Sequence, residues 1–107
     1  MTTISGRADR AVYRFAFADS TDMAKVEEVL LLAILAVGCL HGQAAVRLEV
    51  GYAIKAESRS VVLDAGSALA NAVARVFVGF SAHEFGESAF QIHRGDAIVA
   101  TRDVVQP

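Results

Sequence analysis

The sequence predicts a single α+β domain in which two helices cover one face of an antiparallel sheet. Three observations support this fold class. Apolar and polar residues alternate over 11–18 and 45–56, as in half-buried strands. Two longer segments repeat apolar residues at steps of three and four, as amphipathic helices do. The length of 107 residues fits one domain and excludes separate cofactor and substrate domains.

The first strand is expected over residues 11–18. Alternation places Tyr13, Phe15 and Phe17 on one face, which we expect to meet the helices. The other face then carries Val12, Arg14, Ala16 and Ala18. Residues 1–10 are polar with mixed charges, and we expect them to form a flexible N-terminal arm.

The first helix is expected to begin after the N-cap oxygens of residues 19–22 and to end at Gly38 or Gly42. Its second half, VLLLAILAV, is apolar on every side, and such a helix must be covered on every side. We therefore expect a subunit contact there, with Leu31, Ile34 and Leu35 in the interface.

Residues 45–56 are predicted to form a long second strand. Its inward set, in phase with Phe15, is Val46, Leu48, Val50, Tyr52 and Ile54, and its outward set is Arg47, Glu49, Gly51, Ala53 and Lys55. A polar break at Glu57 and Ser58 then leads into an antiparallel partner strand over 59–65.

The second helix is expected to begin at the N-cap Ser67 and to end within residues 82–86. A strand over 90–94, a two-residue turn at Gly95 and Asp96, and an extra C-terminal strand over 97–101 should follow. We expect the domain to span 11–102 and residues 103–107 to form a C-terminal tail. The order βαββαβ is that of a ferredoxin-like fold, a topology that implies no particular function.

The charge and hydrophobic content of the sequence exclude some classes of binding partner and favour others. The net charge is −2, so the positive field that attracts nucleic acid is absent. The apolar stretch 29–40 is too short to span a bilayer, so no membrane partner is expected. A single cysteine and the lack of a signal-peptide pattern favour the cytoplasm. Hydrophobic residues make up 54% of the chain, more than one small core needs, which favours a homo-oligomer, with a dimer preferred, or docking on a larger protein.

The sheet face turned away from the helices allows three interpretations. It can be solvated, as one face of an antiparallel sheet often is. It can form a self-complementary contact centred on the small residues Ala16, Gly51 and Ala53. It can also border a small-molecule site, for which the candidate residues are Arg14, Arg47, Glu49 and Tyr52.

Other candidate residues favour structural interpretations. His83 and Glu87 would share a helix face near Glu84, but Gly86 interrupts that helix, so no metal or cofactor is predicted. Cys39 is expected to be buried and inert, and His41 does not face it. His93 is expected to be exposed on its strand.

No set of residues in the chain matches a catalytic pattern, and whether it is an enzyme is left open. The leading hypothesis is an association or assembly module without catalytic activity. The alternative is a small-molecule-binding protein or enzyme with a site at the sheet face or a subunit interface, using Arg14, Arg47 and Glu49, with Tyr52 or His93 as further candidates.

Overall fold

The computed structural model describes residues 11–96, and it has the predicted α+β architecture, with helices packed on a four-stranded antiparallel sheet. The expected arm (1–10), extra strand (97–101) and tail (103–107) lie outside the described residues. The elements are β1 (Ala11–Phe17), α2 (Met23–His41), α3 (Gln43–Glu49), β2 (Tyr52–Lys55), β3 (Ser60–Asp64), α4 (Ala68–Phe85), the 3-10 turn η1 (Glu87–Ala89) and β4 (Phe90–Asp96).

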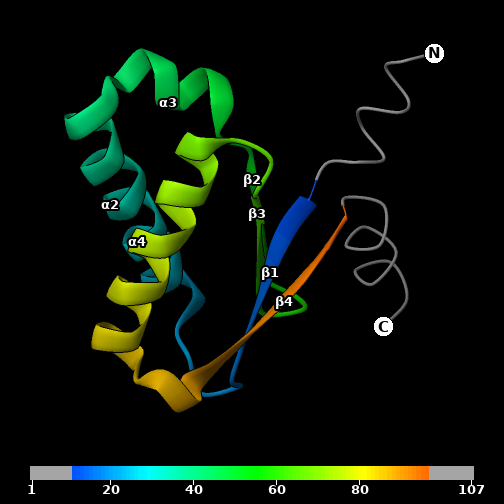
Figure 1. Ribbon diagram of the computed structural model, residues 1–107. Coiled ribbons are helices and arrows are strands. Elements are labelled where there is room, and N and C mark those ends of the chain that lie inside the picture. Colours follow the sequence, from blue (N-terminus) through cyan, green and yellow to red (C-terminus); the bar gives the residue numbers. More distant parts are fainter. Residues whose placement is uncertain (1–10, 97–107) are drawn as a thin grey trace.

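The strands lie in the order β2-β3-β1-β4, and every neighbouring pair is antiparallel. Helices α2 and α4 lie side by side on the same side of the sheet and run in opposite directions (Figure 1). The central strand β1 therefore has one face toward the helices and one face away from them.

Phenylalanines form the centre of the core, as the phase of the first strand predicts. Phe15 is fully buried and meets Phe77 of α4 edge to face, with ring centroids 4.8 Å apart. Phe17 packs similarly against Phe85 at 5.9 Å. Phe15 also lies opposite Val61 of β3, so strand and helix side chains interlock in one cluster.

The ends of the helices follow from local chemistry. The Asp22 carboxylate accepts a hydrogen bond from the Ala24 amide at 3.0 Å, and the Ser67 hydroxyl accepts one from the Ala70 amide at 3.1 Å. Gly42 ends α2 at a φ of 100°, a conformation that glycine adopts without steric cost. Ser67 as N-cap and Gly42 as the end of the first helix are thus confirmed.

The predicted strand over 45–56 is wrong in its first half, because residues Gln43–Glu49 form helix α3. Val46 and Val50 are four residues apart, so they share a face in a helix as well as in a strand. Val46 is buried in the helix, whereas Leu48 points outward and is 87% exposed. Leu48 therefore does not point inward with Phe15, and Arg47 and Glu49 do not lie on the sheet.

The hairpin of the second and third strands is confirmed, with residues 56–59 as its loop. Arg59 closes the loop with a φ of 53°. Its backbone carbonyl accepts a hydrogen bond from the Phe17 amide at 2.8 Å, and its Nε donates to the Ala18 carbonyl at 3.0 Å. These bonds tie the hairpin to the end of β1.

The predicted turn at Gly95 and Asp96 is also wrong. Strand β4 continues through both residues, which pair with Val12 and Ala11 of β1. A glycine-aspartate pair is common in tight turns, but here the backbone hydrogen bonds offered by the edge of β1 extend the strand.

Candidate functional site

The sheet face opposite the helices is called the helix-free face, because no helix of residues 11–96 covers it (Figure 1). The strand register places Arg14 at its centre, directly opposite Val62 on β3 and His93 on β4. Ala16 lies opposite Gln91, and Ala53 of β2 lies opposite Val62. The predicted small residues Ala16 and Ala53 therefore do share this face, and both are half-buried.

Arg14 is half-buried, and its Nε atom is buried without a hydrogen-bond partner. The two ion pairs found among the described side chains both belong to Lys25, so Arg14 has no carboxylate partner within that set. Asp64 lies on the same face diagonally from Arg14, but its Oδ1 accepts a hydrogen bond from the Gly66 amide at 3.0 Å. Arg14 thus lies between apolar Val62 on one side and His93 on the other, with no described carboxylate in an ion pair with it.

The predicted ligand-binding set of Arg14, Arg47, Glu49 and Tyr52 is not brought together. Arg47 and Glu49 are exposed on α3, because residues 43–49 are helical. Tyr52 lies opposite Leu63, which lies opposite Tyr13, so all three are on the side of the sheet that faces the helices. Gly51, expected in the sheet contact, precedes β2 and is exposed. Arg14 alone of the ligand-binding set remains on the helix-free face.

Helix α2 carries a second surface of interest, here called the leucine surface and defined as Leu31, Leu32 and Leu35. These side chains are 46%, 55% and 51% exposed. Residues 31 and 35 are one helical turn apart, and residue 32 adjoins them, so the three form one continuous patch. Ile34, also expected in an interface, is instead half-buried and packs against the core.

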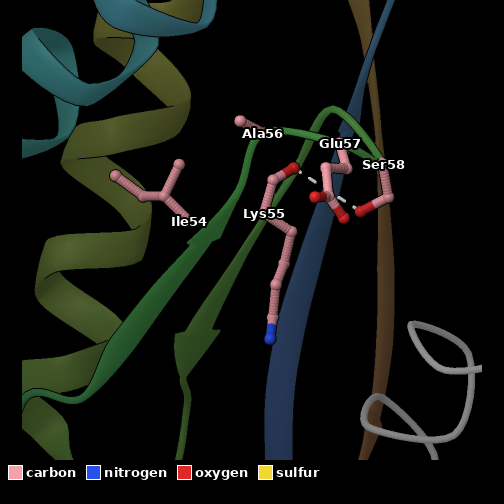
Figure 2. A pocket seen from close by; sticks show the side chains of 5 residues that line it. All are labelled: Ile54, Lys55, Ala56, Glu57 and Ser58. Carbon is pink, nitrogen blue, oxygen red and sulfur yellow. Dashed lines mark hydrogen bonds between the residues drawn. The ribbon is translucent and has the colours of Figure 1, made fainter.

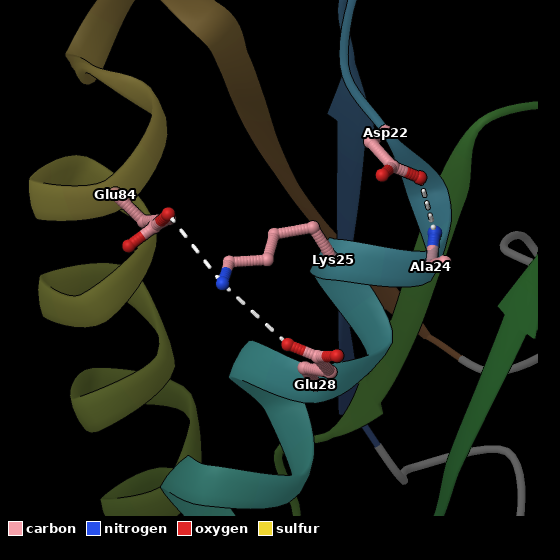
Figure 3. A network of polar contacts seen from close by, with 5 residues as sticks. All are labelled: Asp22, Ala24, Lys25, Glu28 and Glu84. Atoms are coloured by element: carbon pink, nitrogen blue, oxygen red, sulfur yellow. Dashed lines mark hydrogen bonds and ion pairs between the residues drawn. The ribbon is translucent and has the colours of Figure 1, made fainter.

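Charged residues border the leucine surface at the start of α2. The Lys25 ammonium lies 3.5 Å from the Glu28 carboxylate and 3.8 Å from that of Glu84 on α4 (Figure 3). Phe80 lies on α4 one turn before Glu84 and is 38% exposed. Because the helices are antiparallel, Phe80 continues the apolar surface from α2 toward α4.

The histidines and the cysteine do not form a reactive set. His41 and His83 are in the last turns of α2 and α4, as expected. Glu87 lies beyond Gly86 in η1, and residues 11–96 contain no group of three or more His, Cys, Asp or Glu side chains placed to hold a metal ion. Cys39 is exposed, so the prediction of a buried cysteine is wrong. It sits on the outer side of α2, where the helix has no neighbour to cover it.

A hollow of about 370 Å³ lies at the β2–β3 hairpin. It is lined by Ile54, Lys55, Ala56, Glu57 and Ser58. Ile54 points toward α4 (Figure 2). The polar side chains of Lys55, Glu57 and Ser58 spread along the loop and do not converge on a common point (Figure 2). Lys55 and Glu57 carry opposite charges, so the hollow favours no ligand class.

The sequence offers His93 only as a further candidate for the small-molecule site and does not predict that it lies directly opposite Arg14. Alternation placed each residue on the exposed side of its strand, but they are 79 positions apart and no short turn links β1 to β4. Strand pairing of this kind depends on the whole fold. The nearest sequence signal was the shared phase of Phe15 and Ile92 as inward residues.

Comparison with protein-family models, with curated proteins and with solved structures finds no match for this chain. Within residues 11–96, no helix combines the length and the hydropathy needed to cross a membrane. The leucine surface and the helix-free face are therefore the two features of the described residues that bear on function.

Proposed function

We propose that this protein is an association module that forms a dimer through the leucine surface of α2, without catalytic activity of its own. The single observation that carries this proposal is the exposure of Leu31, Leu32 and Leu35 at about half of their surface each. Contiguous apolar patches on monomeric proteins are small, and larger ones mark interaction sites. Phe80 extends this patch onto α4.

A second copy is the partner we favour because the three leucines of the patch lie on one helix, α2. Two such helices can pack against each other around a twofold axis, with the same residues contributed by both chains. Docking on a larger, different protein through the same residues is the other form of the proposal.

The leucine surface is a better contact than the helix-free face, where Ala16 and Ala53 offer a second proposed surface. Burying that face against another sheet would also bury the Arg14 guanidinium. An unpaired buried charge costs several kcal/mol, on the order of 3–5. The leucines carry no such cost.

We infer that the architecture is ferredoxin-like, with α3 as an addition between the first helix and the second strand. The element order and the strand order β2-β3-β1-β4 support this inference. We also propose a cytoplasmic location, supported by the exposed free thiol of Cys39, which a reducing compartment tolerates.

Size-exclusion chromatography with light scattering, at micromolar concentration, tests the association. The unaltered chain should elute with twice the mass of one chain, and the double variant Leu31→Gln and Leu35→Gln should elute as a monomer. The matched control is Leu48→Gln, which makes the same change at an exposed leucine of α3, outside the leucine surface, and should remain dimeric. A monomeric unaltered chain would contradict self-association, and if it also failed to bind the apolar dye ANS, the association surface itself would be refuted.

A further inference from the structure

We propose that Arg14 is the centre of a binding site for an oxyanion, a carboxylate or phosphate group of a small ligand, on the helix-free face. This site is distinct from the leucine surface, and it does not depend on dimer formation. The inference rests on the environment of the guanidinium and on the residues that the strand register places next to it.

The Arg14 guanidinium has a hydrogen-bond donor without a partner. A guanidinium has five N–H donors in a planar fork and no acceptor. The Nε of Arg14 is buried and makes no hydrogen bond, and buried donors normally have a partner. Its direct neighbour on β3 is Val62, which offers no side-chain acceptor. The described side chains therefore leave this donor unsatisfied.

The charge of Arg14 is not neutralised by an ion pair with any described side chain. An arginine paired for structural reasons would have a carboxylate beside it, yet no described acidic side chain lies within ion-pair distance of Arg14. The nearest acidic position on the same face is Asp64, which forms no ion pair with Arg14 and accepts a hydrogen bond from the Gly66 amide at Oδ1. The positive charge of Arg14 is thus available to an incoming anion.

Two side chains of β4 next to Arg14 can donate hydrogen bonds to the same ligand. His93 lies directly opposite it on β4, and Gln91 is the next residue of β4 on the same face. Directly paired residues have Cβ atoms about 5 Å apart, and diagonal ones about 7–8 Å, within reach of one small ligand. Both side chains are exposed and carry N–H donors. Ala16, the next residue of β1 on the same face, and Ala53, beyond Val62 on β2, are too small to block an approaching group.

These features suit one class of ligand. The fork of an arginine binds the two oxygens of a carboxylate or phosphate through two parallel hydrogen bonds. Imidazole and amide donors can satisfy the remaining oxygens. A cationic or purely apolar ligand would leave the orphaned Nε without a partner.

Nuclear magnetic resonance of the full chain labelled with ¹⁵N tests the site. Sodium phosphate and sodium acetate are titrated separately, with sodium chloride used to keep the ionic strength constant. The Arg14 Nε–Hε signal and the His93 amide should shift with saturation for at least one of the two oxyanions. Tighter binding of acetate indicates a carboxylate ligand, and tighter binding of phosphate indicates a phosphorylated one.

Three variants give the site its controls. Arg14→Gln should weaken binding about tenfold or more, the loss expected for a charged hydrogen bond. Arg14→Lys keeps the charge but lacks the planar fork, so binding should weaken without loss of fold. Arg75→Gln, at an exposed arginine on the outer side of α4, should bind as tightly as the unaltered chain.

The proposal is overturned if neither oxyanion gives a saturating shift or if Arg14→Gln binds as well as the unaltered chain. It is also overturned if Asp9→Asn or Asp103→Asn moves the Arg14 Nε–Hε signal in the absence of added oxyanion. That result would show that a carboxylate of the chain itself already occupies the guanidinium.

Discussion

Phe77 shows how much of this fold depends on a single side chain. It is fully buried on α4 and touches both phenylalanines of β1, with ring centroids 4.8 Å from Phe15 and 6.3 Å from Phe17. A ring in this position joins the helix layer to the central strand. Its removal leaves a cavity that the surrounding side chains can fill only in part.

We expect Phe77→Ala to lower the free energy of unfolding by about 3–5 kcal/mol. Phe80→Ala, on the same helix but 38% exposed, should cost less than about 1 kcal/mol. Urea unfolding followed by circular dichroism measures both. Both changes are made in the Leu31→Gln and Leu35→Gln background, so that association does not add to the result. Equal losses in the two variants would show that α4 does not pack as described.

The type of a residue does not by itself determine whether its side chain is buried. Leucine and cysteine are often buried, yet Leu48 is 87% exposed and Cys39 is exposed as well. Neither position could be predicted without knowing which side of its helix has a neighbour. Phe15 and Phe17 were predictable because their alternation with small or charged residues leaves only one face for the core.

At the level of the element, the sequence predicts both long helices and the β2–β3 hairpin, but it does not predict α3. Val46, Leu48 and Val50 alternate, and alternation favours a strand. The residues before and between them are alanine, arginine and glutamate, which favour a helix, and the i, i+4 pair Val46 and Val50 satisfies both patterns. Burial of Val46 next to α2 decides between them, and this is a tertiary effect.

Two glycines near the end of α2 are predicted to respond in opposite ways to alanine. Gly42 has a φ of 100°, a region that alanine rarely enters, so Gly42→Ala should cost about 1–3 kcal/mol. Gly38 is helical, and the three atoms nearest to an added Cβ all belong to the side chain of Gln43, which is exposed and can rotate away. Gly38→Ala should therefore stabilise the helix by about 0.5–1 kcal/mol.

Thermal unfolding of the two glycine variants beside the unaltered chain measures these effects. If Gly38→Ala were as destabilising as Gly42→Ala, the Gln43 side chain would have to be fixed in place by contacts that its exposure does not suggest.

At the scale of the whole molecule, the two faces differ in chemistry. The outer side of the helix layer presents the leucine surface, whereas the helix-free face presents Arg14, His93 and Gln91. The sequence predicts the apolar excess of α2, because VLLLAILAV has no polar face. It could not predict the pairing of Arg14 with His93, which requires β1 and β4 to meet from distant parts of the chain. Association and ligand binding can therefore be tested independently.

If α2 mediates a dimer, the stability of the protein must depend on its own concentration. Partners that bind only the folded state raise the unfolding temperature by mass action, so a tenfold increase in protein concentration should raise Tm by roughly 2–5 °C. The Leu31→Gln and Leu35→Gln variant should show a constant Tm, because its polar glutamines no longer stabilise an apolar contact between two helices. Leu48→Gln should behave as the unaltered chain, because this exposed leucine belongs to α3 and lies outside the leucine surface. Differential scanning calorimetry over a tenfold range of concentration measures the effect. A constant Tm in the unaltered chain would mean that the leucine surface remains exposed in the folded protein, and the stability measured would then be that of a single chain.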